Sequence, residues 1–195
     1  MKLVGLTGGI ATGKSEVTKI LREQGISVFD ADHEVHELYK NGQAAEALKL
    51  LCPTVIVGMS VDRQKLSKLI SETPSLLKGI ESIIHPLVNQ REKHFIDEAR
   101  GLGKQFVVID SPLLIEMGRH QNMDCIVLVA TTLELQKQRA MARPGMTKEK
   151  LDLILSKQMT TDEKRKYSNY VIENNAGREE LRSHTIAAFN KLMGE

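Results

Sequence analysis

Short apolar runs alternate with stretches of helical spacing along most of the chain. Lys2–Leu6 and Ile26–Phe29 are predicted strands, and each is followed by apolar positions three and four residues apart. Phe106–Ile109 and Cys125–Ala130 are continuous runs rich in Val and Ile, which is typical of strands buried on both faces of a parallel sheet. Tyr170–Ile172 is a candidate for a fifth strand. The pattern predicts an α/β fold with a parallel five-stranded sheet flanked by helices.

Two longer stretches interrupt this alternation. The first, about 33–94, is too long for a single crossover between strands, and Leu and Ile recur in it at helical spacing from Leu66 to Ile84. Pro86 is expected to open a further helix in its first turn. The second stretch, Thr132–Lys157, contains two predicted helical segments separated by Arg143, Pro144 and Gly145. We therefore expect two helical insertions in the α/β core.

Composition narrows the class of protein. The chain has 195 residues, of which 41% are hydrophobic and 27% charged, as expected of one globular domain. A net charge of +2 and an aromatic fraction of 4% argue against a nucleic-acid partner. No apolar run approaches the length of a membrane span, and Cys52 and Cys125 are expected to be free thiols of a reduced compartment. We expect a cytoplasmic protein without a membrane partner, and the oligomeric state stays open.

Residues 8–15 fit the phosphate-binding pattern GxxxxGK[ST], after a predicted strand and at the start of a predicted helix. Glycines allow the backbone N–H groups to face a phosphate, and the helix N-terminus adds partial positive charge. Lys14 is expected to reach the β- and γ-phosphates, and the Ser15 hydroxyl to coordinate Mg²⁺. The sequence thus predicts a P-loop NTPase fold. The expected nucleotide-binding residues are Gly8, Gly9, Ile10, Ala11, Thr12, Gly13, Lys14, Ser15 and Glu16.

The phosphate loop alone does not name the reaction, because GTPases, motors and kinases share it. A GTPase would be expected to carry an NKxD motif that reads guanine. The Asn190–Lys191 pair is followed by Leu and Met, so the aspartate of that motif is absent. This disfavours a GTPase.

Several carboxylates follow predicted strands. Asp30 and Asp32 come just after the second strand, and in an extended chain both would point toward the edge of the sheet where ligands bind. One of them is a candidate base for an acceptor hydroxyl, and an N-cap for the helix beginning near His33 is an equal alternative. Asp110 ends a buried strand, where P-loop proteins keep an acid that supports Mg²⁺. Glu116 is left open between a cap, a partner for a cation and an acceptor contact.

Gln136, Arg139 and Arg143 are spaced to share one face of a helix. Arginines held over a transferring phosphate lower its barrier, although a solvated helix face is the common alternative. Residues 131–158 contain six basic and three acidic side chains, a larger surplus than that of the whole chain. The segment is suited to a small, highly charged phosphate ligand.

Together these motifs resemble the dephospho-CoA kinase family over nearly the whole chain. The matching segments, in order, are LTGGIATGKS at 6–15, DAD at 30–32, HPLV at 85–88, DSPLLIE at 110–116, the Gln136, Arg139 and Arg143 pattern, and YVIEN at 170–174. Each motif is short, but their shared order is specific. His85 is interpreted as structural.

This resemblance implies ATP, Mg²⁺ and 3′-dephospho-CoA as ligands, with transfer of the γ-phosphate to the ribose 3′-hydroxyl. Asp32 would be the base, and Lys14, Arg139 and Arg143 would stabilise the phosphoryl group. Ser15 and Asp110 would hold the metal. The implied division is a nucleotide-binding core of about 1–32, 95–133 and 160–195, a helical acceptor-binding insertion of about 33–94 and a lid of about 134–159.

Two alternatives stay open at this point. A nucleoside or nucleotide monophosphate kinase would share the fold and the lid, and a nucleotide-sensing protein would bind ATP without turnover. Asp32 argues against the sensor, which has no use for a base. The chain also departs from the family pattern, because Ile154 stands where an arginine often precedes the lid residue Gln158. Further departures are Pro144, Ser168 and Asn169. Arg139 and Arg143 are therefore expected to carry more of the charge.

Overall fold

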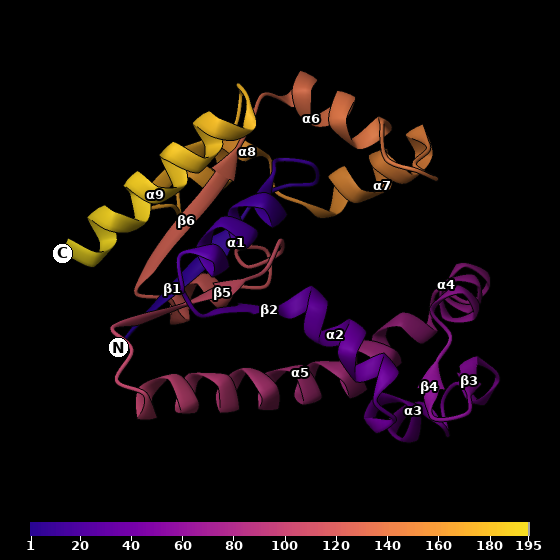
Figure 1. Cartoon of the computed structure of the whole chain (residues 1–195). Helices are drawn as coiled ribbons and strands as arrows, with labels where there is room; N and C mark the ends of the chain where they lie inside the picture. The colour runs from indigo at the N-terminus through magenta and orange to yellow at the C-terminus, as the bar shows by residue number, and fades with distance from the viewer. Residues whose placement is uncertain (195) are drawn as a thin grey trace. The chain divides into compact units, whose positions relative to one another are not determined.

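The computed structural model describes residues 1–194, coloured along the chain in Figure 1, and the chain divides into two units. The first unit consists of Met1–Phe29 together with the chain from Ala99 onward, and the second is Asp30–Glu98. The first unit contains the large sheet and the phosphate loop.

The first unit is built on a five-stranded sheet. The strands in spatial order are β2 (Val28–Asp30), β5 (Phe106–Asp110), β1 (Lys2–Thr7), β6 (Cys125–Ala130) and β7 (Tyr170–Glu173). Strand β1 runs parallel to both β5 and β6, with Leu6 opposite Asp110 and Thr7 opposite Leu128. The predicted α/β fold with a parallel five-stranded sheet is confirmed, and parallel pairing brings the carboxyl ends of β1 and β5 together.

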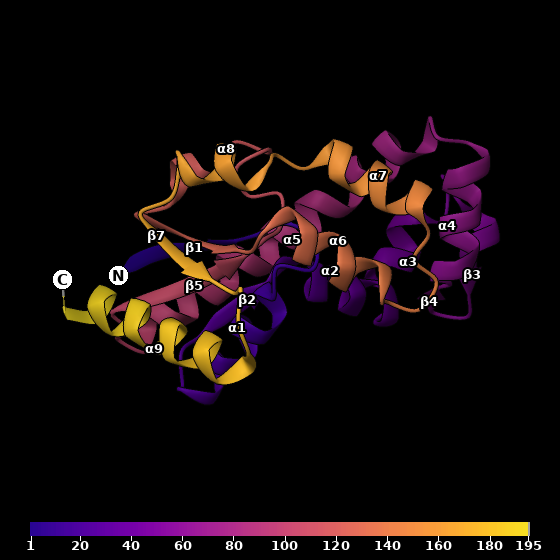
Figure 2. The ribbon, with the colours of Figure 1, turned by 90° about the horizontal axis from the view of Figure 1, so that it is seen from above.

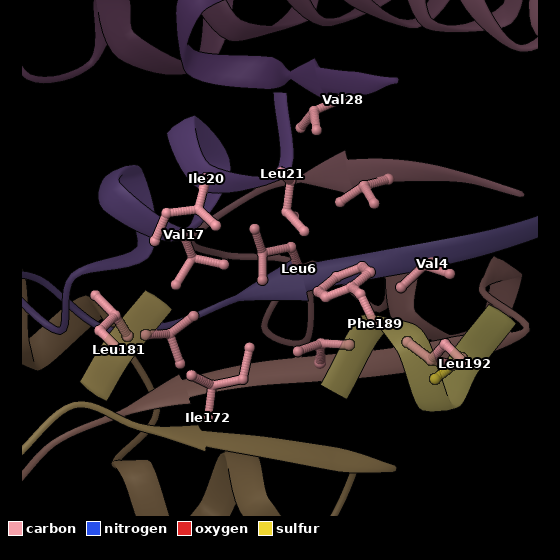
Figure 3. Close-up of a cluster of buried hydrophobic side chains, with 14 residues drawn as sticks. Val4, Leu6, Val17, Ile20, Leu21, Val28, Ile172, Leu181, Phe189 and Leu192 are labelled. Carbon is pink, nitrogen blue, oxygen red and sulfur yellow. The ribbon is translucent and has the colours of Figure 1, made fainter. Parts of the chain in front are cut away.

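Helices α1 (Lys14–Glu23) and α9 (Arg178–Gly194) cover one face of this sheet, as Figure 3 shows from the side chains they bury. The apolar face of α1 and the even-numbered positions of β1 meet side chains of β6, β7 and α9 in one cluster. Its labelled members are Val4, Leu6, Val17, Ile20, Leu21, Val28, Ile172, Leu181, Phe189 and Leu192. Each fully buried aliphatic side chain contributes about 1.5–3 kcal/mol relative to an exposed one.

The opposite face of β1 carries Gly5 and Thr7. A side chain at Gly5 would meet Leu114 Cδ2 at 2.5 Å, because the chain after β5 packs directly on the strand there. Helix α8 (Thr161–Arg165) lies on this side, across the sheet from α1 and α9 (Figure 2). Before it come α6 (Leu133–Met141) and α7 (Lys148–Lys157), the two helical segments expected from the sequence. A short helix, η2 (Arg119–Asn122), precedes β6.

The second unit is mostly helical. Its elements are α2 (Ala31–Lys40), α3 (Gln43–Leu48), η1 (Pro53–Val55), the antiparallel pair β3 (Ile56–Val57) and β4 (Ser60–Val61), α4 (Arg63–Glu72) and most of α5 (Leu76–Gly101). The small hairpin was not expected from the sequence, because each of its strands has only two residues.

Helix α5 corrects one prediction. Pro86 does not open a new helix but lies inside a continuous helix of 26 residues. Proline removes the hydrogen bond to the carbonyl four residues earlier, but Pro86 is on the exposed side of α5, where water can satisfy that carbonyl. Ile80, Ile84 and Val88 are buried at intervals of four residues along the helix, so packing favours continuity. Among residues 1–194 no helix has both the length and the apolar character needed to cross a membrane.

Candidate active site

The phosphate loop connects β1 to α1 and requires glycine for two physical reasons. Gly13 has φ 98°, a left-handed conformation that side chains disfavour, and it caps α1. A side chain at Gly8 would come within 2.8 Å of the backbone oxygen of Val129 in β6. Ala11 also has a positive φ of 59°, which is unusual for a residue with a side chain. Its methyl group is buried against Ala140 and Leu151, so packing stabilises this strained conformation.

Lys14 and Asp110 form an ion pair beside this loop. Lys14 is the first residue of α1, and Asp110 is the last residue of β5. The ammonium of Lys14 contacts Asp110 Oδ1, while Oδ2 accepts a hydrogen bond from the Thr18 hydroxyl at 2.5 Å. Asp110 is only 1% exposed, so these two donors compensate a buried negative charge. Ser15, the next residue along α1, is exposed.

The segment that contains α6 and α7 packs onto the phosphate loop through apolar and polar contacts. Ala140 and Leu151 cover Ala11, as described above. The side-chain oxygen of Gln158, which follows α7, accepts a hydrogen bond from the Ile10 N–H at 2.9 Å. Gln136 is 5% exposed and lies so close to Gly9 that a Cβ there would be 2.5 Å from Gln136 Nε2. Residues far apart in the sequence thus converge on the loop.

Arg139 and Arg143 do not share a helical face as expected. Helix α6 ends at Met141, because Pro144 and Gly145, the latter with φ 73°, turn the chain. Arg143 therefore lies after the helix and is exposed. Arg139 lies within α6 and donates to the backbone oxygen of Asn174 at 2.9 Å. Arg139 is thereby tied to Asn174, whose side-chain amide donates to the backbone oxygen of Thr12 in the phosphate loop.

Asp30 and Asp32 separate into two environments. Asp30 ends β2 and caps α2, since its side chain accepts a hydrogen bond from the His33 N–H at 3.0 Å. Asp32 is exposed in the first turn of α2. The expectation that both carboxylates extend from the same strand is therefore wrong. Because Asp30 is the N-cap, α2 begins at Ala31, one residue before Asp32. Partial burial lowers the pKa of His36, with Arg63 lowering it further and Asp32 opposing that shift.

Lys164 and Glu116 form a buried ion pair next to Thr7, the residue that precedes the phosphate loop. Lys164 in α8 is 0% exposed, and its ammonium contacts Glu116 Oε1 at 3.0 Å. Burial lowers the pKa of this lysine, whereas the hydrogen bond and the charge of Glu116 raise it. Of the three possibilities left open for Glu116, the structure shows the ion pair with a cation. The importance of Lys164 was missed because its sequence neighbours are polar and charged, as in an ordinary exposed helix.

The family model described as dephospho-CoA kinase matches residues 2–180. This chain belongs to the dephospho-CoA kinase family. A dephospho-CoA kinase of Bartonella quintana is 42% identical over 193 residues, which cover 99% of each chain. Another of Rhodopseudomonas palustris is 40% identical over 182 residues, which cover 93% of this chain and 91% of the relative.

Solved structures share the fold of this chain. A crystal structure from Thermus thermophilus is 34% identical with a TM-score of 0.80, and the match covers 98% of this chain and 97% of the other. A dephospho-CoA kinase from Campylobacter jejuni, 22% identical with a TM-score of 0.70 over 97% and 96% of the two chains, shares the fold. So does a shikimate kinase from Acinetobacter baumannii, 18% identical with a TM-score of 0.56 over 100% and 94%. The fold is therefore that of P-loop kinases, and the family is one of ATP-dependent kinases.

The residues of this dephospho-CoA kinase family member suit a magnesium ion that arrives with a nucleotide. The hydroxyl of Ser15 and the carboxylate of Asp110 are the hard oxygen donors that Mg²⁺ prefers. In residues 1–194 no group of three or more His, Cys, Asp and Glu side chains is arranged to hold a metal ion. Mg²⁺ commonly takes one or two protein ligands and completes its shell with phosphate oxygens and water. A hydroxyl and a carboxylate fit that mode of binding.

Proposed function

We propose that this chain transfers the γ-phosphate of ATP to the 3′-hydroxyl of dephospho-CoA, giving coenzyme A and ADP, the last step of coenzyme A synthesis. The observation that carries the proposal is the family match over residues 2–180, in a chain whose phosphate loop has the required lysine. Family membership favours this acceptor over a nucleoside monophosphate, and favours turnover over nucleotide sensing. A cytoplasmic location is part of the proposal.

Residues 8–16 would bind the triphosphate through backbone N–H groups and the positive end of α1. Lys14 would exchange its contact with Asp110 for one with the β- and γ-phosphates, where its charge offsets the charge of the leaving group. Ser15 and Asp110 would hold Mg²⁺. The ion would neutralise phosphate charge when bound. Arg139 and Arg143 would add positive charge at the transferring phosphoryl group. Such electrostatic stabilisation is strongest in a site from which water is excluded.

Asp32 is the proposed base. Its carboxylate is exposed in the first turn of α2 and does not cap the helix, because Asp30 does. It would accept the proton of the 3′-hydroxyl while the oxygen attacks the γ-phosphorus, so no covalent intermediate on the protein is needed.

Each of three parts of the chain has its own proposed role. A core of about 1–32, 95–133 and 160–195 would bind ATP, the insertion of about 33–94 would bind dephospho-CoA, and the lid of about 134–159 would exclude water. Contacts of Ala140, Leu151 and Gln158 with the phosphate loop support the role of the lid. Excluding water matters because water would otherwise accept the phosphoryl group.

A substrate panel tests the proposal. Purified protein is given ATP and Mg²⁺ with dephospho-CoA, AMP, CMP or adenosine, and the products are identified by mass spectrometry. We expect a phosphorylated product only from dephospho-CoA, with the added phosphate at the 3′ position. The Lys14→Ala variant serves as the control for contaminating kinases and should lose about 10²- to 10³-fold in kcat. Turnover of a nucleoside monophosphate alone would show that the acceptor is wrong.

A further inference from the structure

The buried side chain of Lys164 in α8 connects this helix to the end of β1 and to the chain that follows β5. Nζ donates to the backbone oxygen of Pro112 at 2.7 Å, to Glu116 Oε2 at 3.2 Å and to the hydroxyl of Thr7 at 3.4 Å. Thr7 is the last residue of β1, directly before the phosphate loop. An ammonium has three donors, and here each has an acceptor without any exposure to water. The lysine is therefore a fixed internal support.

Glu116, the partner of Lys164, also binds the end of the lid. Its Oε1 accepts a hydrogen bond from the Met159 N–H at 2.8 Å. Met159 lies in the short connection between the end of α7 at Lys157 and Thr160, which caps α8. One carboxylate thus holds both a buried ammonium and the backbone of the connection through which the lid returns to the core.

The residue before Met159 makes the second attachment. Gln158 accepts a hydrogen bond from the Ile10 N–H in the phosphate loop at 2.9 Å. Neighbouring residues of one extended connection are therefore tied in two directions, Met159 to Glu116 and Gln158 to the loop. A change in the backbone at Met159 would move the amide of Gln158 away from Ile10.

We propose that Glu116 is a positioning residue for the lid: its side-chain oxygen accepts from the Met159 N–H and sets the backbone there so that Gln158 meets the phosphate loop. This inference rests on the proposed function, because it takes ATP as the ligand of that loop. The ion pair and the bond to Met159 are separable, since a neutral oxygen at position 116 can still accept from the N–H.

Two double variants separate these roles. Glu116→Gln with Lys164→Met and Glu116→Ala with Lys164→Met both remove the two charges, so neither leaves a lone buried charge. Glutamine keeps an acceptor for the Met159 N–H, whereas alanine does not. We expect the alanine variant to raise the KM for ATP about tenfold with a kcat change under about threefold, and the glutamine variant to stay within about threefold in both. Equal KM values in the two variants would overturn the proposal.

A measurement without ATP makes the outcome independent of turnover. Hydrogen exchange of the Met159 amide, followed by NMR in the nucleotide-free protein, should be about tenfold faster in the alanine variant than in the glutamine variant. Gln158→Ala should raise the KM for ATP and leave this exchange rate unchanged. If Gln158→Ala leaves the KM for ATP unchanged, the proposed link between Gln158 and the phosphate loop is overturned. If wild-type protein makes no coenzyme A, the proposed function fails, while the exchange rates still decide the role of Glu116.

Discussion

Arg139 donates a hydrogen bond to the backbone oxygen of Asn174 at 2.9 Å, and the side-chain amide of the same asparagine donates to the backbone oxygen of Thr12 at 2.8 Å. The hydroxyl of Thr131 adds a third bond, to the Asn174 oxygen at 3.0 Å. Asn174 is buried directly after β7, so its amide depends on Thr12 rather than on bulk water. Asn174 therefore adds a hydrogen-bonded link between the phosphate loop and α6 to the packing of Ala140 on Ala11.

Replacing Asn174 by alanine should weaken both stability and nucleotide binding. The Thr12 oxygen would lose its donor, which costs about 1–3 kcal/mol in the free energy of unfolding. Because the loop would be less fixed, we also expect the KM for ATP to rise about tenfold. Urea unfolding and steady-state kinetics measure the two effects. Asn190→Ala, at an exposed position of α9, is the control and should change stability by less than about 0.5 kcal/mol. Similar unfolding of the two variants would contradict the role of Asn174.

Glycines with positive φ lie just outside both ends of α1, and they form a matched pair. Gly13 and Gly25 both have positive φ, 98° and 73°, so alanine at either position carries conformational strain of about 1–2 kcal/mol. At Gly13 a Cβ would also lie 2.2 Å from Asn174 Nδ2, whereas at Gly25 it would meet nothing within 4 Å. We expect Gly13→Ala to abolish detectable ATP binding by calorimetry and Gly25→Ala to leave it unchanged. Retained binding by Gly13→Ala would show that the loop tolerates the shift.

The features that could be predicted from the sequence are those whose signal is local. The β6 run Cys125–Ala130 is apolar throughout because both faces of a central parallel strand are buried. The phosphate loop is equally local, since its glycines, Lys14 and Ser15 lie within eight residues. In both elements, the residue types are explained by the structure of the segment in which they lie.

The features that were missed depend on distant parts of the chain. Pro86 follows a local rule for helix starts, but the buried residues on either side of it favour one long helix. Lys164 is buried by β1 and by the chain after β5, which are more than forty residues away, so its own neighbours carry no signal. Asp32 was expected in extended chain, because the cap at Asp30 and the helix start cannot be placed to within one residue from spacing alone.

The two aspartates give a matched test of the proposed base. Asp30→Asn should leave kcat within about threefold, because asparagine is as good an N-cap as aspartate and can still accept from the His33 N–H. Asp32→Asn should keep ATP binding and lower kcat by about 10²- to 10⁴-fold, since an amide cannot take the hydroxyl proton. Calorimetry with ATP and initial rates with dephospho-CoA measure both effects. Near-normal turnover by Asp32→Asn would remove its role as base.

His36 makes the stability of the protein depend on pH. Its pKa lies below the ordinary value of 6.5, chiefly because the ring is partly buried, and Arg63 adds to the shift. The unfolded chain keeps the ordinary pKa, so below about pH 6.5 it binds a proton more readily than the folded state does. The free energy of unfolding should therefore fall between about pH 7 and pH 5, and it should fall less in His36→Gln, which has no proton to gain at this position. Urea unfolding of the wild type and of His36→Gln at both pH values checks this. The same loss in His36→Gln as in wild type would assign the pH dependence to other groups.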